Sequence, residues 1–295
     1  RKDKTFLLDW MQVYMEAQES AGKKDGSQIK IAMRILKDYA GEMVTLDQID
    51  GDFCRGYITY LLTEYHPKGK DISNYTLHNY YRALNGALNS AVRKKKMKAN
   101  PFNELEKSEK IRKPESMRSY MTIEEVQALI DTPMPHEEYE IVKCAYLFSC
   151  FCGLRISDII KLKWNDVFVD RGQYRLAVSM KKTKEPIYLP LSPEALKWMP
   201  ERGGKSSEDN VFDLPSANTI RMQLKPWAKA AGISKRFSYH TSRHTFATMM
   251  LTLGADLYTV SKLLGHADVK MTQVYAKIIN KKKDEAVNLV NGLFH

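Results

Sequence analysis

The residues best suited to chemistry gather in one stretch, residues 239–275. His240 and Arg243 stand three apart, so they share one face if the segment is helical. His266 follows a glycine that ends a periodic apolar run, and Tyr275 comes nine residues later. Basic side chains on a shared face suit an anion, and a nearby tyrosine is a potential nucleophile. The stretch predicts part of a phosphate-handling site, with the rest supplied by earlier segments.

Two earlier segments offer further basic residues. Arg155 directly follows the glycine that should end a strongly apolar helix over residues 139–152. Lysines 181, 182 and 184 fall in the turn between predicted strands at 174–179 and 187–191, and another short strand is expected at 167–169. Each group has an ordinary alternative, because an arginine at a helix corner often caps carbonyls and lysines in a hairpin turn often protect a sheet edge.

Length and charge limit the class of protein. The 295 residues are 43% hydrophobic, enough for two cores, and 46 Lys+Arg against 35 Asp+Glu give a net charge of +11. That balance favours a polyanionic partner such as nucleic acid. No apolar run is long enough to span a membrane, and we expect neither a signal peptide nor secretion. The four cysteines lack paired CxxC spacing, which favours buried free thiols in a reducing compartment over a zinc site.

The first hundred residues predict a small bundle of four helices. Apolar residues recur at helical period over residues 5–20 and in three later segments, which Ser27, Asp50 or Asp52, and Ser73 are expected to begin. The fourth helix is expected to run into a basic tract before Asn100. The tract is either a solvated helix terminus or a segment that binds a phosphate backbone. Its basic residues are Arg93, Lys94, Lys95, Lys96 and Lys98.

A densely charged stretch separates this bundle from a second domain. Residues 104–118 read as an exposed linker, which gives domains at 1–103 and 119–295. Thr122 and Glu125 form a capping-box pattern at the start of the second domain, and Ser192 and Ser216 are plausible starts of later helices. We therefore expect a mainly α protein with a small antiparallel β-sheet in its second domain, and a last amphipathic segment after Tyr275.

Taken in order, the motifs resemble those of the tyrosine recombinase (integrase) family, which includes the Xer, Cre and lambda-type integrases. The resemblance covers the whole chain in organisation, with specific motifs confined to residues 120–280. The matching residues are Gly153-Leu-Arg-Ile-Ser-Asp158, Lys182-Thr183, His240-Thr-Ser-Arg-His-Thr245, Leu263-Leu-Gly-His266 and Tyr275. The resemblance implies a SAM-like helical core-binding domain followed by a mixed α/β catalytic domain.

The resemblance also implies roles for individual residues. Tyr275 would be the nucleophile, ahead of Tyr239 and Tyr258 in the same stretch, and His240 would accept its proton. The donors to the scissile phosphate would be Arg155, Arg243 and His266. Lys182 would protonate the leaving 5′-oxygen, with Lys181 and Lys184 as rivals that otherwise contact DNA, and Asp158 would orient the site through hydrogen bonds.

The sequence departs from the family pattern at two places. Asp158 stands where the family usually has a glutamate, one methylene longer, which puts its partner in doubt but keeps its charge. Thr-Ser stands between His240 and Arg243 where Asp-Leu is common. Because the His, the Arg and the following His244-Thr245 are retained, we expect an active enzyme.

The implied reaction needs no cofactor. A phosphotyrosyl diester conserves the energy of the DNA bond, the chain has no phosphate-binding GxxxxGK[ST] loop, and no carboxylate cluster is set out for metal ions. We expect strand exchange through a 3′-phosphotyrosine and a Holliday junction, without ATP or metal. The alternatives are a type IB topoisomerase-like enzyme and a catalytically silent architectural DNA-binding protein.

The implied partners are double-stranded DNA core sites and further copies of the chain. We expect a monomer when free, a homotetramer on synapsed DNA, accessory DNA-bending proteins and a cytoplasmic, nucleoid-associated location. The amphipathic segment after Tyr275 is expected to dock on a neighbouring protomer, with packing on its own domain as the alternative.

Overall fold

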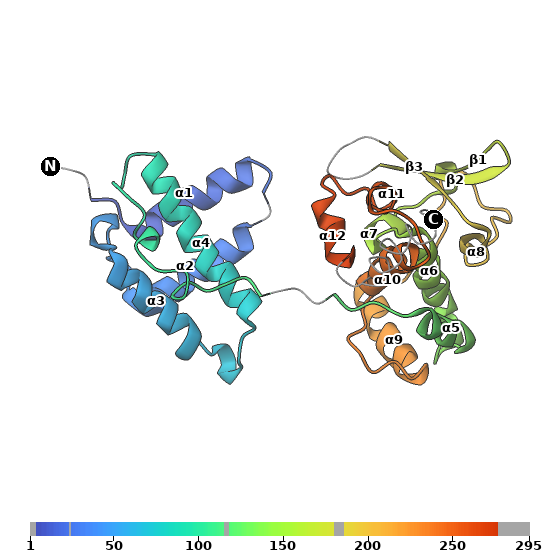
Figure 1. The fold of residues 1–295 in the computed structure, drawn as a ribbon, viewed down its shortest axis with the longest axis horizontal. Helices are drawn as coiled ribbons and strands as arrows, with labels where there is room; N and C mark the ends of the chain where they lie inside the picture. Colours follow the sequence, from blue (N-terminus) through green and yellow to red (C-terminus); the bar gives the residue numbers. More distant parts are fainter. Residues whose placement is uncertain (1–3, 24, 115–117, 180–185, 277–295) are drawn as a thin grey trace, which may run out of the picture. The chain divides into compact units, whose positions relative to one another are not determined.

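The computed structural model describes residues 4–23, 25–114, 118–179 and 186–276. The chain divides into two compact units, Arg1–Ser116 and Met117–His295, and each has a hydrophobic core of its own. Figure 1 shows helices alone in the first unit, and helices with a small sheet in the second. The expectation of a mainly helical protein with a small antiparallel sheet is confirmed. Within the described residues, no helix is long and apolar enough to cross a membrane.

The described residues of the first unit form four α-helices with short 3₁₀ turns between them. The pairs α1–α2, α2–α4 and α1–α4 pack together, and Trp10 reaches across the bundle to donate to the Ala87 carbonyl over 2.9 Å. Asp50 and Ser73 cap α3 and α4 with their side chains, as expected for such residues at helix starts. The elements are α1 (Leu7–Ser20), α2 (Gly26–Ala40), η1 (Leu46–Gln48), α3 (Gly51–Thr63), η2 (Pro67–Gly69), α4 (Asn74–Arg93) and η3 (Pro101–Asn103).

Three expectations for this unit need correction. Ser27 does not cap α2, because the helix begins at Gly26 and Asp25 is its N-terminal neighbour. The helix α4 ends at Arg93, and the positive φ of Lys95 (58°) takes the basic tract out of helical geometry into an exposed turn. The charged stretch that starts at residue 104 is not exposed throughout, since Leu105 and Ile111 are buried in the core of the first unit.

The second unit is mainly helical, and several of its helices begin at residues that the sequence predicted as caps. Thr122 and Glu125 form the expected capping box of α5, and Ser192 and Ser216 cap α8 and α9. The elements are α5 (Ile123–Asp131), η4 (Glu137–Tyr139), α6 (Glu140–Cys152), α7 (Ile156–Ile159), η5 (Trp164–Asp166), α8 (Pro193–Leu196), α9 (Ala217–Ala230), α10 (Tyr239–Thr252), α11 (Leu257–Leu263) and α12 (Lys270–Ala276).

The helices α6 and α10 form the centre of this unit. They pack against each other, and the apolar face that the sequence predicted for residues 139–152 is almost wholly buried. The Tyr239 hydroxyl lies inside this contact, donating to the Ala145 carbonyl over 2.6 Å. Cys150 and Cys152 are buried here as free thiols, and Cys54 is a buried free thiol of the first unit, as predicted, whereas Cys144 is free but only partly buried.

The sheet has three antiparallel strands in the order β1-β2-β3, namely β1 (Val167–Asp170), β2 (Gln173–Ser179) and β3 (Pro186–Pro190). Val167 pairs with Leu176, and Leu176 pairs in turn with Leu189, which places the buried leucines side by side toward the core. Ser179 pairs with Pro186, so the hairpin between β2 and β3 is the predicted one. The lysines of its turn, Lys181, Lys182 and Lys184, lie outside the described residues.

Candidate active site

A tight corner at the end of α6 places Arg155. Gly153 ends the helix in the left-handed conformation (φ 76°), as its position predicted. Arg155 then precedes α7, and the Asp158 carboxylate accepts from the Arg155 backbone N–H over 3.3 Å. The Ser157 hydroxyl donates to the same carboxylate over 3.2 Å. Asp158 thus holds the backbone that carries Arg155, and its role in orienting the site stays a prediction.

Arg243 joins this corner to the end of α11. It lies on α10, is only 3% exposed, and donates to the Gly153 carbonyl over 2.8 Å and to the Leu264 carbonyl over 2.6 Å. Both carbonyls belong to helix ends that lack internal partners. Burial, and then the positive charge of Arg155, lower the pKa of Arg243 to about 10. The guanidinium therefore stays charged at neutral pH and keeps N–H groups for a further acceptor.

His266 enters the site just after α11. The turn is made by Gly265 in the left-handed conformation, and His266 Nδ1 lies 2.7 Å from the hydroxyl of Thr272 on α12. If that hydroxyl donates to Nδ1, the ring keeps its Nε2–H to donate elsewhere. Burial, with the charges of Arg243 and Arg155, lowers the pKa of His266 to about 4, so its imidazole is neutral at pH 7.

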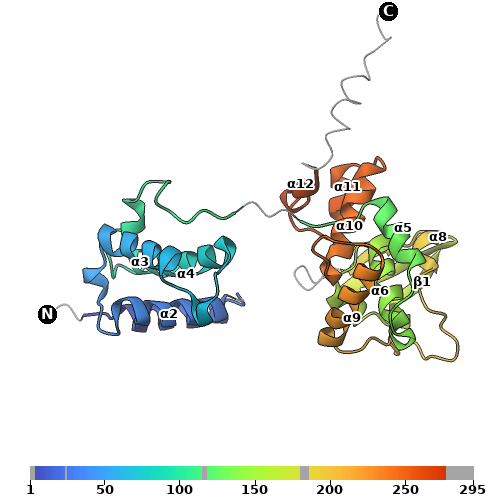
Figure 2. The same ribbon diagram turned by 90° about the horizontal axis from the view of Figure 1, so that it is seen from below.

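Tyr275 is buried in the small hydrophobic core formed by α10, α11 and α12. It is 1% exposed and packs in one cluster with Phe246, Val260 and Leu264. Figure 2 shows these three helices together at one end of the unit. The buried ring explains why a helix of only seven residues holds its place.

The Tyr275 hydroxyl contacts two basic side chains. His244 Nδ1 lies 2.6 Å from the phenolic oxygen, and Arg118 Nη1 donates to it over 3.2 Å. Neither residue was predicted to have a role of its own, although His244 stands four residues after His240 on the same helical face. Arg118 could not be found from spacing, because it is 157 residues from Tyr275.

His240 is the exposed member of the histidine pair on α10. Its ring meets that of His244 edge to face, with centroids 4.4 Å apart. Partial withdrawal from water, followed by the charges of Arg243, Arg118 and Arg155, lowers the pKa of His240. A neutral imidazole of this kind has a nitrogen free to accept a proton.

The fold therefore brings most of the predicted residues into one neighbourhood. Arg155, Arg243, His266 and Tyr275 come from four segments that Arg243 and the small core tie together, and His240 lies one turn before Arg243. Among the rival tyrosines, Tyr239 has its hydroxyl in the core and Tyr258 is 60% exposed, with the Lys262 amine 5.2 Å from its ring centre. Lys182 lies outside the described residues.

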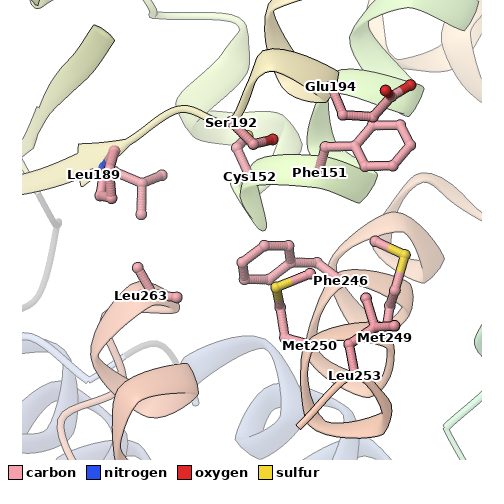
Figure 3. A pocket seen from close by; sticks show the side chains of 11 residues that line it. Phe151, Cys152, Leu189, Ser192, Glu194, Phe246, Met249, Met250, Leu253 and Leu263 are labelled. Carbon is pink, nitrogen blue, oxygen red and sulfur yellow. The ribbon is translucent and has the colours of Figure 1, made fainter. Parts of the chain in front are cut away.

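An apolar pocket of about 320 Å³ lies beside this neighbourhood. Figure 3 shows it between the end of α6 and β3 on one side and α10 and α11 on the other. Its walls include Phe151, Leu189, Phe246, Met250 and Leu263. The charged residues expected in the site do not line it, so it is a separate feature of the surface. Within the described ranges, no three His, Cys, Asp or Glu side chains are grouped to hold a metal ion.

Comparison with known proteins agrees with the motifs. The phage integrase family matches residues 119–282, more than half of the chain, and the phage integrase SAM-like domain matches residues 6–112. The chain therefore belongs to the phage integrase family. The resemblance to tyrosine recombinases drawn from the motifs is confirmed.

Individual relatives carry the same description. A tyrosine recombinase of Pseudothermotoga lettingae is 29% identical over 242 residues, which cover 74% of this chain and 82% of the relative. The XerD tyrosine recombinase of Vibrio vulnificus is 32% identical over 57% of this chain, which spans only 59% of that relative. Among solved structures, a lambda integrase tetramer bound to a Holliday junction is similar in fold, with a TM-score of 0.69 at 21% identity over 93% of this chain and 78% of that chain.

Proposed function

We propose that this chain is a site-specific DNA recombinase that cleaves and rejoins DNA through a 3′-phosphotyrosine, without ATP or metal. The observation that carries the proposal is the position of Arg243. Its guanidinium bonds both the corner before Arg155 and the turn before His266, and Tyr275 lies in the core behind that turn. Membership of the phage integrase family supports the same activity.

Three donors would bind the scissile phosphate. Arg155 and Arg243 would give charged N–H groups to its non-bridging oxygens, and His266 would give its Nε2–H. Such donors act most strongly on the charge that grows in the transition state, and removal of one typically slows a reaction by roughly a hundredfold or more. The fixed carbonyl bonds of Arg243 favour this role, because they orient the guanidinium before DNA arrives.

The proton transfers would use two further residues. Tyr275 attacks phosphorus and gives its phenolic proton to His240, while the bond from phosphorus to the 5′-oxygen breaks and that oxygen takes a proton from Lys182. A 5′-hydroxyl of the partner strand then reverses these steps, which regenerates the tyrosine and joins the exchanged strands. Two rounds of exchange pass through a Holliday junction.

The proposal also covers assembly and domain organisation. Residues 1–103 would bind core-site DNA, with Arg93, Lys94, Lys95, Lys96 and Lys98 near the backbone, 104–118 would connect the domains and 119–295 would be catalytic. All five of those basic residues are exposed. The active form would be a tetramer on synapsed duplex DNA, assembled from monomers with accessory DNA-bending proteins at the nucleoid. The segment after Tyr275, which lies outside the described residues, would dock on a neighbouring protomer.

The nucleophile is tested by a covalent-adduct assay. A nicked duplex carrying a core site that the chain binds is incubated with protein and run on a denaturing gel. We expect a protein–DNA band with the natural chain and with Tyr258→Phe, which removes an exposed hydroxyl, and no band with Tyr275→Phe. A band that persists in Tyr275→Phe would refute the assignment, and no band in any protein would favour a silent architectural role. Relaxation of supercoiled plasmid without a core site would indicate a topoisomerase.

A further inference from the structure

The hydroxyl of Tyr275, the proposed nucleophile, is covered on two sides by other side chains. Arg118 Nη1 donates to the phenolic oxygen, and His244 Nδ1 lies 2.6 Å away on the other side. An arginine can only donate, so the phenolic proton is free to point at Nδ1. With its side chain 1% exposed, the tyrosine in this position has no access to a DNA phosphate.

Arg118 covers the ring as well as the hydroxyl. Its guanidinium carbon lies 5.6 Å from the centre of the Tyr275 ring, within the range of a cation–π contact. One side chain therefore holds both the face and the polar end of the tyrosine. His244 holds the tyrosine in the same two ways from its own side, with ring centres 5.5 Å apart and Nδ1 2.6 Å from the hydroxyl.

The segment that carries Arg118 is fastened to α10. The Met121 backbone N–H donates to the Thr245 hydroxyl over 2.9 Å, next to His244. The Lys235 amine donates to the Tyr120 carbonyl over 2.8 Å. These bonds fix the backbone two and three residues after Arg118, while the Arg118 side chain itself is half-buried.

His244 favours the same closed state. Burial, followed by the charges of His240, Arg118, Arg243 and His266, lowers the pKa of His244 to about 3. Its imidazole is therefore a poor base and accepts a hydrogen bond from the phenol without removing the proton.

We propose that Arg118 is a positioning residue that holds Tyr275 closed, and that a DNA phosphate releases the tyrosine by drawing the guanidinium away. The proposal rests on the proposed function of Tyr275. A phosphodiester is an anion that can take two parallel hydrogen bonds from a guanidinium, whereas the neutral phenol takes one over 3.2 Å. DNA that enters the cationic site thus competes for Arg118, and the freed phenol then gives its proton to His240.

The test measures access to Tyr275 without DNA. Tetranitromethane nitrates exposed tyrosines, and mass spectrometry gives the rate at each one. In Arg118→Ala we expect Tyr275 nitration to rise at least about tenfold over the natural chain, the population change that one charge-assisted hydrogen bond can produce. The reagent reaches only accessible tyrosine side chains, so a rise reports exposure. Arg221→Ala is the matched control, because Arg221 is exposed and bonds only Asn218 in the described contacts.

Two tyrosines of the same molecule serve as internal standards. Tyr258 (60% exposed) should react in every variant, and Tyr146 (fully buried) should stay protected wherever the fold is intact. If Arg118→Ala exposes Tyr146, the fold is lost and Arg118→Lys is the deciding variant, with a smaller rise at Tyr275 expected.

The outcomes separate this proposal from the recombinase proposal. An unchanged or lower rate of Tyr275 nitration in a folded variant overturns the positioning role of Arg118, whatever the enzyme does to DNA. A higher rate together with absence of any covalent adduct supports the positioning role and refutes Tyr275 as nucleophile. A higher rate with faster adduct formation on a nicked site supports both.

Discussion

The change Arg243→Lys should weaken the fold as well as the reaction. The guanidinium makes two hydrogen bonds to main-chain carbonyls, of 2.8 Å to Gly153 and 2.6 Å to Leu264, and the side chain is 3% exposed. A lysine keeps the charge but lacks the planar fork that reaches both carbonyls together. One carbonyl is then left buried without a donor. Loss of a hydrogen bond from a charged donor costs about 1.5–3 kcal/mol, so we expect the free energy of unfolding to fall by about 2–3 kcal/mol.

Urea denaturation followed by circular dichroism measures this loss. Arg221→Lys is the matched control, since Arg221 is exposed and donates to Asn218 on its own helix. Its effect should stay within about 0.5 kcal/mol, as for most surface changes. A loss below about 0.5 kcal/mol in Arg243→Lys would refute the view that this arginine ties the two helix ends together. Covalent adduct formation by the folded variant should also slow by roughly a hundredfold, and an unchanged rate would refute its role as phosphate donor.

Two further predictions concern Gly153, at the end of α6, and the histidines. Gly153→Ala should lower the free energy of unfolding by about 2–4 kcal/mol, because φ is +76° at this position and the new methyl would lie 2.6 Å from Phe246 Cδ1. Gly172→Ala is the matched control, since its φ is +79° but the new methyl would meet open space, and it should cost only about 1 kcal/mol; equal losses in urea denaturation would contradict the packing argument. The pKa of His244 falls from 6.5 in the unfolded chain to about 3 in the folded one, so between these pH values the unfolded state binds more protons. The free energy of unfolding therefore decreases as the pH falls below 6.5, and this residue alone accounts for a loss of roughly 2 kcal/mol at pH 5. His266, with its pKa of about 4, acts in the same direction. His244→Gln should show a shallower fall in urea midpoint between pH 6.5 and 5 than the natural chain, and parallel curves would argue against the depressed pKa of His244.

Local chemistry explains why much of the fold was predictable. Gly153 could be assigned to a helix end because helices often end at a residue in the left-handed conformation, which glycine adopts without a steric cost since it has no Cβ. The capping boxes, the apolar period of α6 and the alternating strands are likewise decided by residues close together in the chain. The same local rules failed at the basic tract after Arg93, where charge and lysine content favour a longer helix but Lys95 adopts a positive φ.

The order of the motifs determined which residues we expect in the site. Arg155, Arg243, His266 and Tyr275 carry the family pattern by type and spacing, so the sequence alone predicts their membership. Their contacts do not. Whether a guanidinium donates to carbonyls, to phosphate or to both depends on which helix ends lie beside it, and these are far apart in the chain.

The surroundings of Tyr275, the proposed nucleophile, were decided by tertiary structure alone. The sequence singles out Tyr275, but its burial among α10, α11 and α12 and its hydrogen bond from Arg118 arise only when segments 157 residues apart meet. Long-range packing decides how far the site residues are withdrawn from water and how close the arginines lie to them. These two factors lower the pKa values of the histidines and keep the Tyr275 hydroxyl away from solvent. The sequence thus predicts the reacting groups, whereas only the fold places the Tyr275 hydroxyl between Arg118 and His244.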